Sequence, residues 1–517
     1  MKETLLSIDV GTQSTRALLF DTDGELLASE QVPIEPYESP RPGWDERDAL
    51  VYWRAMAQAC RGLRERHAER LDRAVGLSLT TQRATMVCVD AAGEPLRPAI
   101  VWLDQRECDA PPPLGPLWGT LLRAVGAGDL VAHFQRQAEC NWLAQHQPET
   151  WARTARFLFL SGFLTHRLTG EYIDSVGSQV GYVPFDYKRL DWSAASDFKW
   201  RAAAVRREQL PELAQPGTVI GELQADAARA LGLREGLPVV AAAADKACEV
   251  LGSGAIEPDV AALSFGTTAT INTTQTKYVE VQRMLPPYPA AMPGQYNTEI
   301  QIYRGFWMVS WFKREFAHRE AALAAERGVA VESLFDELIR DIPPGSMGLT
   351  LQPYWSPGVR DPGPEAKGAI IGFGDVHTRA HLYRAILEGL AYGLRAGAEQ
   401  IERRTGRRLS RVVAAGGGSQ SDVAMQLTAD IFNRPTTRPH VYETSGLGAA
   451  INQAVGLGLY ADYAAALKAM TRPGAEFTPR PEAAETYDRL YREVYAPLYP
   501  RLQPLYQKIR RITGYPA

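Results

Sequence analysis

The strongest constraint on the fold is a unit that occurs twice along the chain: an apolar strand, a turn containing Gly and Thr, and a second strand. In the first copy, TLLSIDV at 4–10 and TRALLFD at 15–21 are joined by GTQS. In the second copy, VAALSF at 260–265 is followed by GTT at 266–268 and by ATINTT, about 250 residues further on. Because strands and helices follow each copy, the sequence predicts two related α/β domains.

A boundary between the two domains is expected at LGSG, residues 251–254, where small residues can act as a hinge. This divides the chain into an N-terminal domain, residues 1–252, and a C-terminal domain, residues 253–517. A chain of this length fits two large α/β domains, which often exceed the usual ~150 residues. Residues 341–364 are rich in Pro and Gly and are expected to form a loop.

Hydrophobic spacing predicts further elements in each half. In the first half these are strands at 25–34, 74–80 and 84–90 and a helix at 45–70. In the second half they are helices at 379–404 and 421–432, a strand at 411–415 and a terminal helical region at 482–511. This mixture of strands and helices is typical of α/β folds.

Charge and cysteine content exclude several classes of protein. The net charge is −4, from 60 acidic and 56 basic residues, so no basic excess points to nucleic acid as a partner. The five cysteines are scattered and form no CxxC pair, which is typical of reduced thiols in a cytoplasmic protein. No apolar stretch approaches the ~20 residues of a membrane span, and Asp9 interrupts the first apolar run, so neither a membrane partner nor a signal peptide is expected.

Three turns rich in Gly, Thr and Ser follow apolar strands, at residues 9–14, 266–268 and 416–419. Glycine lets backbone N–H groups approach a phosphate closely, and hydroxyl groups add donors. One such turn is weak evidence, but three at strand ends, two of which match between the halves, indicate a phosphate-binding protein. The chain has neither GxxxxGK[ST] nor a GxGxxG after its first strand, which argues against a P-loop enzyme and a dinucleotide-binding fold.

Asp9 lies near the end of the first strand, within an otherwise apolar run. A buried carboxylate is unfavourable unless it is paired or binds a cation. Asp9 could simply cap the turn, but beside Gly-Thr a water-mediated contact with Mg²⁺ is the better interpretation, because Mg²⁺ keeps several waters and uses few carboxylates. Arg16, on the next strand, could pair with a phosphate or face solvent.

Asp245 follows a strand of small apolar residues, LPVVAAAA at 237–244, and precedes a predicted helix at 246–251. An aspartate at this place is often the N-cap of the helix. The functional alternative is a general base, since phosphoryl transfer needs a carboxylate that orients and deprotonates the attacking hydroxyl. The position at the end of a strand, beside the predicted hinge, favours the base.

Together these motifs resemble the FGGY family of carbohydrate kinases, and the resemblance covers essentially the whole chain in the same order. SIDVGTQSTRALLFD is similar to the first phosphate motif of the family, ADKACEVLGSG to the segment with its catalytic aspartate, and LSFGTTATI to its second phosphate motif. Residues 368–388 resemble the C-terminal signature, with Phe373 where an aliphatic residue is usual. AAGGGSQSDVAMQLTADIFNRP is similar to the adenosine motif.

The resemblance implies an α/β fold with two ribonuclease-H-like (actin-like ATPase) domains around an interdomain cleft, and ATP-dependent transfer of phosphate to an alcohol group. Asp245 would be the catalytic base, and Asp9 would help to hold Mg²⁺. The residues implied to surround ATP are Thr12, Gln13, Ser14, Arg16, Gly266, Thr267, Gly417 and Ser421. Dimers are common in the family, so a homodimer is also an expectation, although the sequence shows no interface pattern.

The sugar is expected in the N-terminal domain, near the ends of its strands. Sugars are held by polar side chains that hydrogen-bond hydroxyls and by aromatic rings that lie against C–H groups. The candidates that supply such groups are Gln82, Arg83, Trp102 and Asp104. Core packing explains Trp102 equally well.

Substrate positions differ from those of the resembling subfamilies. Glycerol kinases typically have Glu at the position of Ala84, Tyr at that of Phe134 and Gln at that of Lys246. Xylulose kinases usually show Gln-Met-His, of which only Gln82 remains. A pentulose such as xylulose is therefore favoured over glycerol or another polyol. Lys246 is interpreted as a lysine on the solvent face of a helix rather than as a contact for an acidic sugar.

Two other classes of protein stay open. An actin- or Hsp70-like ATPase without sugar transfer would share the phosphate turns, but the placement of Asp245 and the signature at 368–388 favour the kinase. A catalytically idle sugar-binding regulator would explain the altered substrate positions, but Asp9, Asp245 and the glycine turns are all intact.

Overall fold

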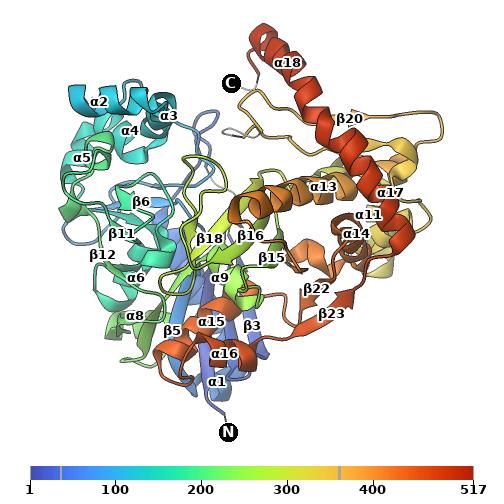
Figure 1. Cartoon of the computed structure of the whole chain (residues 1–517). Coiled ribbons are helices and arrows are strands. Elements are labelled where there is room, and N and C mark those ends of the chain that lie inside the picture. Colours follow the sequence, from blue (N-terminus) through green and yellow to red (C-terminus); the bar gives the residue numbers. More distant parts are fainter. Residues whose placement is uncertain (1, 35–37, 359–361, 516–517) are drawn as a thin grey trace. The chain divides into compact units, whose positions relative to one another are not determined.

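The structure is a computed structural model that describes residues 2–34, 38–358 and 362–515. It divides into two compact units, each drawn from several stretches of the chain (Figure 1). Unit 1 comprises Met1–Gly254, Thr276–Asn297 and Glu443–Thr471, and unit 2 comprises Ala255–Gln275, Thr298–Tyr442 and Arg472–Ala517. The first stretch of unit 1 ends within the predicted hinge, but unit 1 also includes two later stretches that a division at 252 would place in the C-terminal half.

Unit 1 is built on a mixed six-stranded sheet with the order β13-β14-β5-β1-β2-β3. Its strands are β1 (Thr4–Val10), β2 (Ser14–Asp21), β3 (Leu26–Pro33), β5 (Ala74–Thr81), β13 (Val219–Glu222) and β14 (Pro238–Ala244). β1 pairs antiparallel with β2 and parallel with β5, and β14 is parallel to β5. The nearly continuous apolar sequences of β1 and β14 suit central strands that are covered on both faces.

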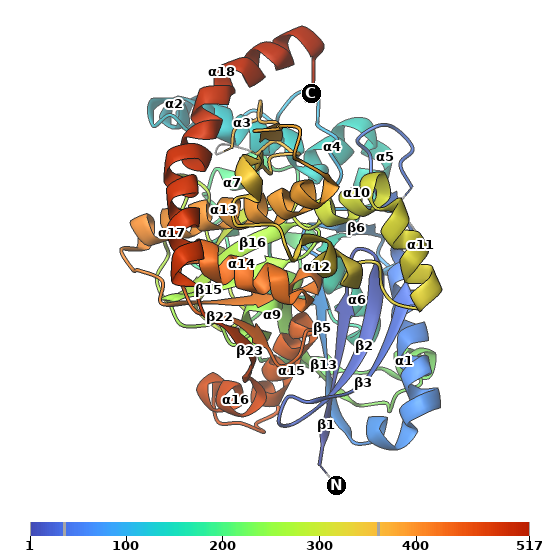
Figure 2. The same ribbon diagram turned by 90° about the vertical axis from the view of Figure 1, so that its right-hand side faces the viewer.

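Long helices pack on this sheet. α1 (Ala49–Leu71) lies beside β2 and β3 (Figure 2). α15 (Thr444–Gly456) packs on β1, β5 and β14, and α9 (Asp245–Gly252) packs against α15. The small residues of both helices let their backbones approach closely, so the contact fixes the helix that begins at Asp245.

A second, smaller sheet in unit 1 has the order β4-β7-β6-β8. Its strands are β4 (Glu46–Arg47), β7 (Ala99–Ile100), β6 (Met86–Val89) and β8 (Arg156–Phe159). The helices that follow its strands are α2 (Gly115–Ala124), α3 (Gly128–Gln137), α4 (Glu139–His146), α5 (Pro148–Arg153) and α6 (Leu160–Thr169). This part of unit 1 has its own aromatic core, which includes Trp142 and Phe185. The candidate sugar residues at 102–104 follow β7.

The strands of unit 2 repeat the arrangement of unit 1 in the order β18-β16-β15-β21-β22-β23. They are β15 (Val260–Phe265), β16 (Ala269–Gln275), β18 (Tyr296–Ile302), β21 (Arg411–Ala415), β22 (Thr436–Pro439) and β23 (Pro473–Phe477). β15 is antiparallel to β16 and parallel to β21, β21 is parallel to β22, and the edge strand β23 is antiparallel. Since β1, β5 and β14 are related in the same way, the prediction of two related ribonuclease-H-like α/β domains is confirmed.

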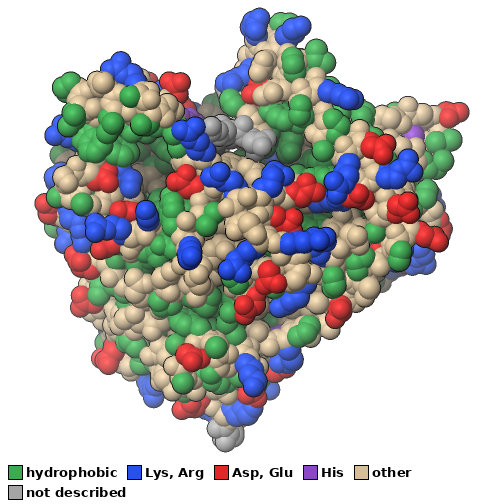
Figure 3. Space-filling model, viewed as in Figure 1, with side chains coloured by type: hydrophobic (Ala, Val, Ile, Leu, Met, Phe, Trp, Pro, Cys, Tyr) green, Lys and Arg blue, Asp and Glu red, His purple; other side chains and the backbone are tan. Residues whose placement is uncertain are grey.

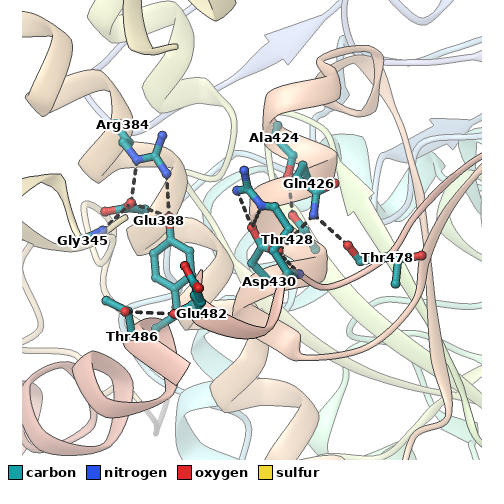
Figure 4. A network of polar contacts seen from close by, with 12 residues as sticks. Gly345, Arg384, Glu388, Ala424, Gln426, Thr428, Asp430, Thr478, Glu482 and Thr486 are labelled. Carbon is teal, nitrogen blue, oxygen red and sulfur yellow. Dashed lines mark hydrogen bonds and ion pairs between the residues drawn. The ribbon is translucent and has the colours of Figure 1, made fainter. Parts of the chain in front are cut away.

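The helices of unit 2 include α10 (Trp307–Phe316), α11 (His318–Arg327), α12 (Ser333–Ile339), α13 (Arg379–Thr405) and α14 (Asp422–Phe432). The predicted helices at 379–404 and 421–432 are thus confirmed within one residue. α13 is mostly buried and carries a carboxylate near its middle, Glu388. Arg384 and the hydroxyl group of Tyr487 both donate to Glu388, at 2.9 and 2.8 Å, and the Gly345 N–H donates at 3.0 Å (Figure 4). This network satisfies a charge that would otherwise be unfavourable in the core.

Some predicted elements differ in their extent. The strand expected at 84–90 starts only at Met86, because Ala84 adopts a positive φ of 52°. The expected loop at 341–364 contains a short helical turn, Ser346–Gly348, and the strand β19 (Thr350–Gln352), while 359–361 lie outside the described residues. The terminal helical region consists of α17 (Pro481–Leu490), a π-helical turn and α18 (Ala496–Thr513).

The described surface carries charges of both signs. Acidic and basic side chains are interspersed on the face drawn in Figure 3. All five cysteines are free and buried. No helix within the described ranges is long and apolar enough to cross a bilayer.

Candidate active site

The candidate site of unit 1 starts from three parallel strands that end in register. Val10 of β1 lies opposite Thr81 of β5, which lies opposite Ala244 of β14. The N–H of Gln82 then donates to the carbonyl of Val10 at 3.0 Å. The chain therefore leaves all three strands at one edge of the sheet, and this edge carries the phosphate turn after β1, the predicted sugar residue Gln82 and Asp245.

Asp245 is the first residue of α9, one position earlier than predicted, and Ala244 takes the N-cap position. Its Oδ1 accepts the Lys246 N–H at 2.7 Å. Burial raises the pKa of the Asp245 carboxyl, and the positive charges of Lys246 and Arg83 lower it. Because its pKa is raised overall, the Asp245 carboxylate is more basic than a carboxylate in water, although two cations lie near it.

Asp9 faces Arg16 across the β1–β2 pair, where the two residues are direct cross-strand partners. Arg16 Nη1 lies 3.4 Å from Asp9 Oδ2. Burial raises the pKa of Asp9 to about 7, Arg16 lowers it, and the carboxylates of Asp245 and Glu443 raise it further. Asp9, Asp245 and Glu443 thus form a group of interacting carboxylates, and Arg16 pairs with two of them.

No group of three or more potential ligands close enough to hold a metal ion is found among the residues described. A cation bound mainly through water and phosphate needs no such group. Glu443, directly before α15, is a member of the carboxylate group that sequence reasoning missed. The one signal for it was an acidic residue at the start of a helical pattern, which is common at helix N-termini and therefore unspecific.

Two predicted sugar residues are hydrogen-bonded to the phosphate turn. Trp102 Nε1 donates to Thr12 Oγ1 at 3.0 Å, and Thr12 Oγ1 donates to Gln82 Oε1 at 2.8 Å. Gln82 Nε2 donates to the hydroxyl of Tyr52 at 2.8 Å. The structure thus brings Thr12, Gln82 and Trp102 together, and it uses both ends of the buried Gln82 amide to brace the turn.

The Asp104 carboxylate is hydrogen-bonded to other groups of the protein. Its carboxylate forms two bonds with Arg106, at 2.7 and 2.6 Å, and accepts the Asp45 N–H at 2.8 Å. Arg106 lies between the rings of Trp44 and Trp142, at 4.2 and 4.6 Å. The role of Asp104 in sugar binding stays a prediction, and in this structure it orders the loop after β7.

Arg83 and Lys246 are the two cations beside Asp245. The Arg83 guanidinium lies 4.9 Å from the ring centre of Tyr288. Lys246 does not face solvent as predicted: its side chain is 21% exposed, and its Nζ lies 2.8 Å from Glu249 Oε2, one helical turn further on. The interpretation of Lys246 as a lysine on the solvent face is therefore wrong, because its side chain is mostly covered and paired with Glu249.

The two phosphate-type turns of unit 2 lie at the ends of parallel strands. Gly266 and Thr267 connect β15 to β16, and their carbonyls accept from the N–H groups of Phe306 and Trp307 at 3.0 and 3.3 Å. Gly417 follows β21 and opens a 3₁₀ turn at Gly417–Gln420. A Cβ atom added to Gly417 would meet nothing within 4 Å, so its backbone borders open space.

Ser421 caps α14. Its Oγ accepts the Ala424 N–H at 3.0 Å and donates to Asp336 Oδ1 at 2.6 Å. Burial raises the pKa of Asp336. Asp336 was not among the site residues predicted from the sequence. Of the remaining predicted ATP residues, Ser14 accepts from Gln31 at 3.0 Å, and the carbonyl of Gln13 accepts the Ile34 N–H at 2.8 Å.

Glu139 is the first residue of α4 and lies three residues before Trp142. Burial raises the pKa of Glu139 to about 8, and the nearby Asp104 raises it while Arg106 lowers it. The folded state therefore keeps a proton on Glu139 that the unfolded chain releases above pH 4.5, so the folded state loses stability as the pH rises from about 4.5 to 8.

We expect Glu139→Gln to remove this pH-dependent loss. The variant should gain about 2 kcal/mol over the wild type at pH 8 and almost nothing at pH 4. Thermal unfolding of both proteins at pH 4 and pH 8 measures the difference, and all other titrating groups cancel in the comparison. An equal difference in melting temperature at both pH values would contradict the assignment.

Both halves of the chain match models of one protein family. The N-terminal domain of the FGGY family of carbohydrate kinases matches residues 4–252, and the C-terminal domain of that family matches residues 261–457.

Similar proteins cover nearly the whole chain. The uncharacterized sugar kinase YgcE of Escherichia coli is 29% identical over 96% of this chain and 93% of its own. The xylulose kinase of Lactococcus lactis is 28% identical over 94% and 95%. The crystal structure of xylulose kinase from Rhodospirillum rubrum superposes with a TM-score of 0.79 and 27% identity, covering 98% of this chain and 100% of that one. With both domains of the family matched and the predicted fold confirmed, this chain belongs to the FGGY family of carbohydrate kinases.

Proposed function

We propose that this kinase transfers the terminal phosphate of ATP to a hydroxyl group of a pentulose such as xylulose, with Asp245 as general base. The observation that carries the proposal is the shared strand edge of unit 1. There, β14 ends at the base and β1 ends at the phosphate turn, in register through β5. A base and a phosphate turn on one edge can serve one reaction.

Asp245 performs the proton transfer of this reaction. As the hydroxyl oxygen of the sugar attacks the γ-phosphorus, its proton passes to a carboxylate oxygen of Asp245, the bond from the γ-phosphorus to the β–γ bridging oxygen breaks, and ADP leaves with that electron pair. Burial raises the pKa of the Asp245 carboxyl and makes the carboxylate a stronger base, while the positive charges of Lys246 and Arg83 oppose that rise.

ATP would be bound by the glycine turns and the residues beside them. In unit 1 these are the turn from Thr12 to Ser14 and Arg16, and in unit 2 they are Gly266, Thr267, Gly417 and Ser421. Asp9 would hold Mg²⁺ through water, and the ion would neutralise the developing phosphate charge. The open space at Gly417 and the buried Asp9 carboxylate both fit this assignment. The buried free thiols support a cytoplasmic location.

A pentulose is favoured over glycerol by two residues that lack the groups expected in a glycerol kinase. Ala84 offers no carboxylate for a hydroxyl of glycerol, and Phe134 offers a ring that packs on Tyr182 at 5.7 Å instead of a phenol. The relatives named xylulose kinase add support. Lys246 lies beside the base, so sugar acids belong among the compounds to be tested.

A coupled assay of ADP release over pentuloses, hexuloses, alditols, glycerol and sugar acids tests the function. The proposed kinase gives ADP release that depends on a pentulose and yields one phosphosugar per ADP. Hydrolysis without sugar would favour the alternative of an actin- or Hsp70-like ATPase, and release with glycerol alone would favour a polyol kinase. No ADP release at all would favour a sugar-binding regulator.

Gly417→Val tests the nucleotide turn of unit 2. The added side chain enters open space, so the melting temperature should stay within about 2 °C of the wild type, whereas ATP affinity should fall about tenfold because the side chain fills the place of the nucleotide. Titration calorimetry with ATP and a thermal scan without ATP measure the two effects. Unchanged ATP affinity would remove Gly417 from the site.

A further inference from the structure

Arg16 is shared between two carboxylates that come from different elements of unit 1. Its Nη1 lies 3.4 Å from Asp9 on β1, and its Nε lies 3.4 Å from Glu443, which directly precedes α15. Both distances exceed the 2.7–2.9 Å that is usual when Arg bonds a carboxylate directly. The side chains of Asp9 and Glu443 are only 9% and 10% exposed, so water does little to weaken either attraction.

The shared position leaves one donor of Arg16 without a hydrogen bond. Its Nε is buried and has no hydrogen-bond partner among the described residues. The guanidinium of Arg16 is shared by the two carboxylates and forms a short ion pair with neither of them. An arginine in this state is ready to bind a third anion without first breaking a short ion pair.

We infer that Glu443 is a positioning residue that keeps Arg16 from closing on Asp9 and so holds it in place for a phosphate group of ATP. The inference rests on the proposed function for its ligand. Without the charge of Glu443, the cross-strand neighbours Arg16 and Asp9 would form a short ion pair. That pair would withdraw Arg16 from phosphate and Asp9 from the cation in one step.

Glu443→Gln tests the inference, because the amide keeps the shape of the side chain and removes its charge. We expect the Kd for Mg·ATP, measured by calorimetry without sugar, to rise about tenfold, and the melting temperature without ATP to stay the same or rise, since burial already raises the pKa of Glu443. Glu443→Asp, which keeps the charge on a shorter stem, should give an intermediate Kd.

The control is Glu399→Gln in unit 2, because Glu399 Oε1 also lies 3.4 Å from an arginine Nε, that of Arg395 on α13. This variant loses an ion pair of the same length outside the site, and its Kd for Mg·ATP should match the wild type. A tenfold rise in the Kd of Glu399→Gln would overturn the inference, because the effect would then be a general one of lost charge.

A double-mutant cycle with Arg16→Met shows whether Glu443 acts through Arg16. If it does, Glu443→Gln has little further effect on the Kd in the Arg16→Met background. Additive effects, an unchanged Kd in Glu443→Gln, or a fall in melting temperature as the only change would each overturn the inference. A wild type that binds ATP but phosphorylates no sugar would refute the proposed function alone, since the binding cycle needs no sugar.

Discussion

Asp245→Asn is expected to reduce sugar phosphorylation at least 10³-fold and to leave ATP binding within about twofold of the wild type. The amide has nearly the same size, but it cannot take the proton from the attacking hydroxyl. The fold should not suffer, because burial already disfavours the charge of Asp245, as its raised pKa shows. Sugar-dependent ADP release, ATP calorimetry and a thermal scan measure the three properties.

Asp226→Asn is the matched control. Asp226 also lies in the first turn of a helix of unit 1, α8 (Ala225–Leu231), but it is exposed and pairs with Arg229 on the same helix. Its variant should keep wild-type turnover. If Asp245→Asn retained more than a tenth of wild-type turnover, Asp245 would not be the base. The shared strand edge would then no longer support the proposed reaction.

The local sequence pattern was sufficient to predict where the strands β1 and β14 end. Asp9 and Asp245 each follow a run of apolar residues that can only be a buried strand, and a polar residue at that point either ends the strand or serves a function. Both expectations need only the neighbouring residues, and the observed strands end at Val10 and Ala244. The repeated strand–turn–strand unit likewise predicted the common topology, because a hairpin with a glycine turn is encoded within twenty residues or so.

Contacts between distant segments could not be predicted in this way. Glu443 joins Arg16 only because α15 returns from the far end of the chain to pack on β1. Asp104 has the composition of a sugar ligand, but Arg106, two residues on, takes both of its oxygens. The exposure of Lys246 was mispredicted because a helix as short as α9 gives too little sequence pattern to show how far each side chain is covered.

The second large effect is expected for Gly448→Ala, because Gly448 lies where α9 and α15 are in close contact. A Cβ atom at Gly448 would collide with the carbonyl oxygen of Cys248, and one at Gly252 would lie 2.6 Å from the backbone nitrogen of Gly448. Both obstacles are backbone atoms, so no side chain can move aside to make room. The two helices would have to separate, and the start of α9 carries Asp245.

We therefore expect Gly448→Ala to lower the free energy of unfolding by about 3 kcal/mol and the melting temperature by more than 5 °C. In the protein that remains folded, kcat/KM for the sugar should fall about 100-fold, since a shift of about 1 Å in a catalytic group has effects of that size. Gly252→Ala, on the other side of the contact, should act in the same direction. Scanning calorimetry and the coupled assay at a temperature well below the transition measure both effects.

Gly119→Ala separates this effect from the general result of replacing a helical glycine. Gly119 lies within α2, where an added Cβ atom meets nothing within 4 Å, so the change should stabilise that helix by about 0.5–1 kcal/mol and leave activity unchanged. At Gly448, by contrast, the added Cβ atom meets backbone atoms of α9. A Gly448→Ala variant with wild-type stability and turnover would mean that α9 and α15 can move apart freely, and the position of Asp245 would then have to be fixed by β14 alone.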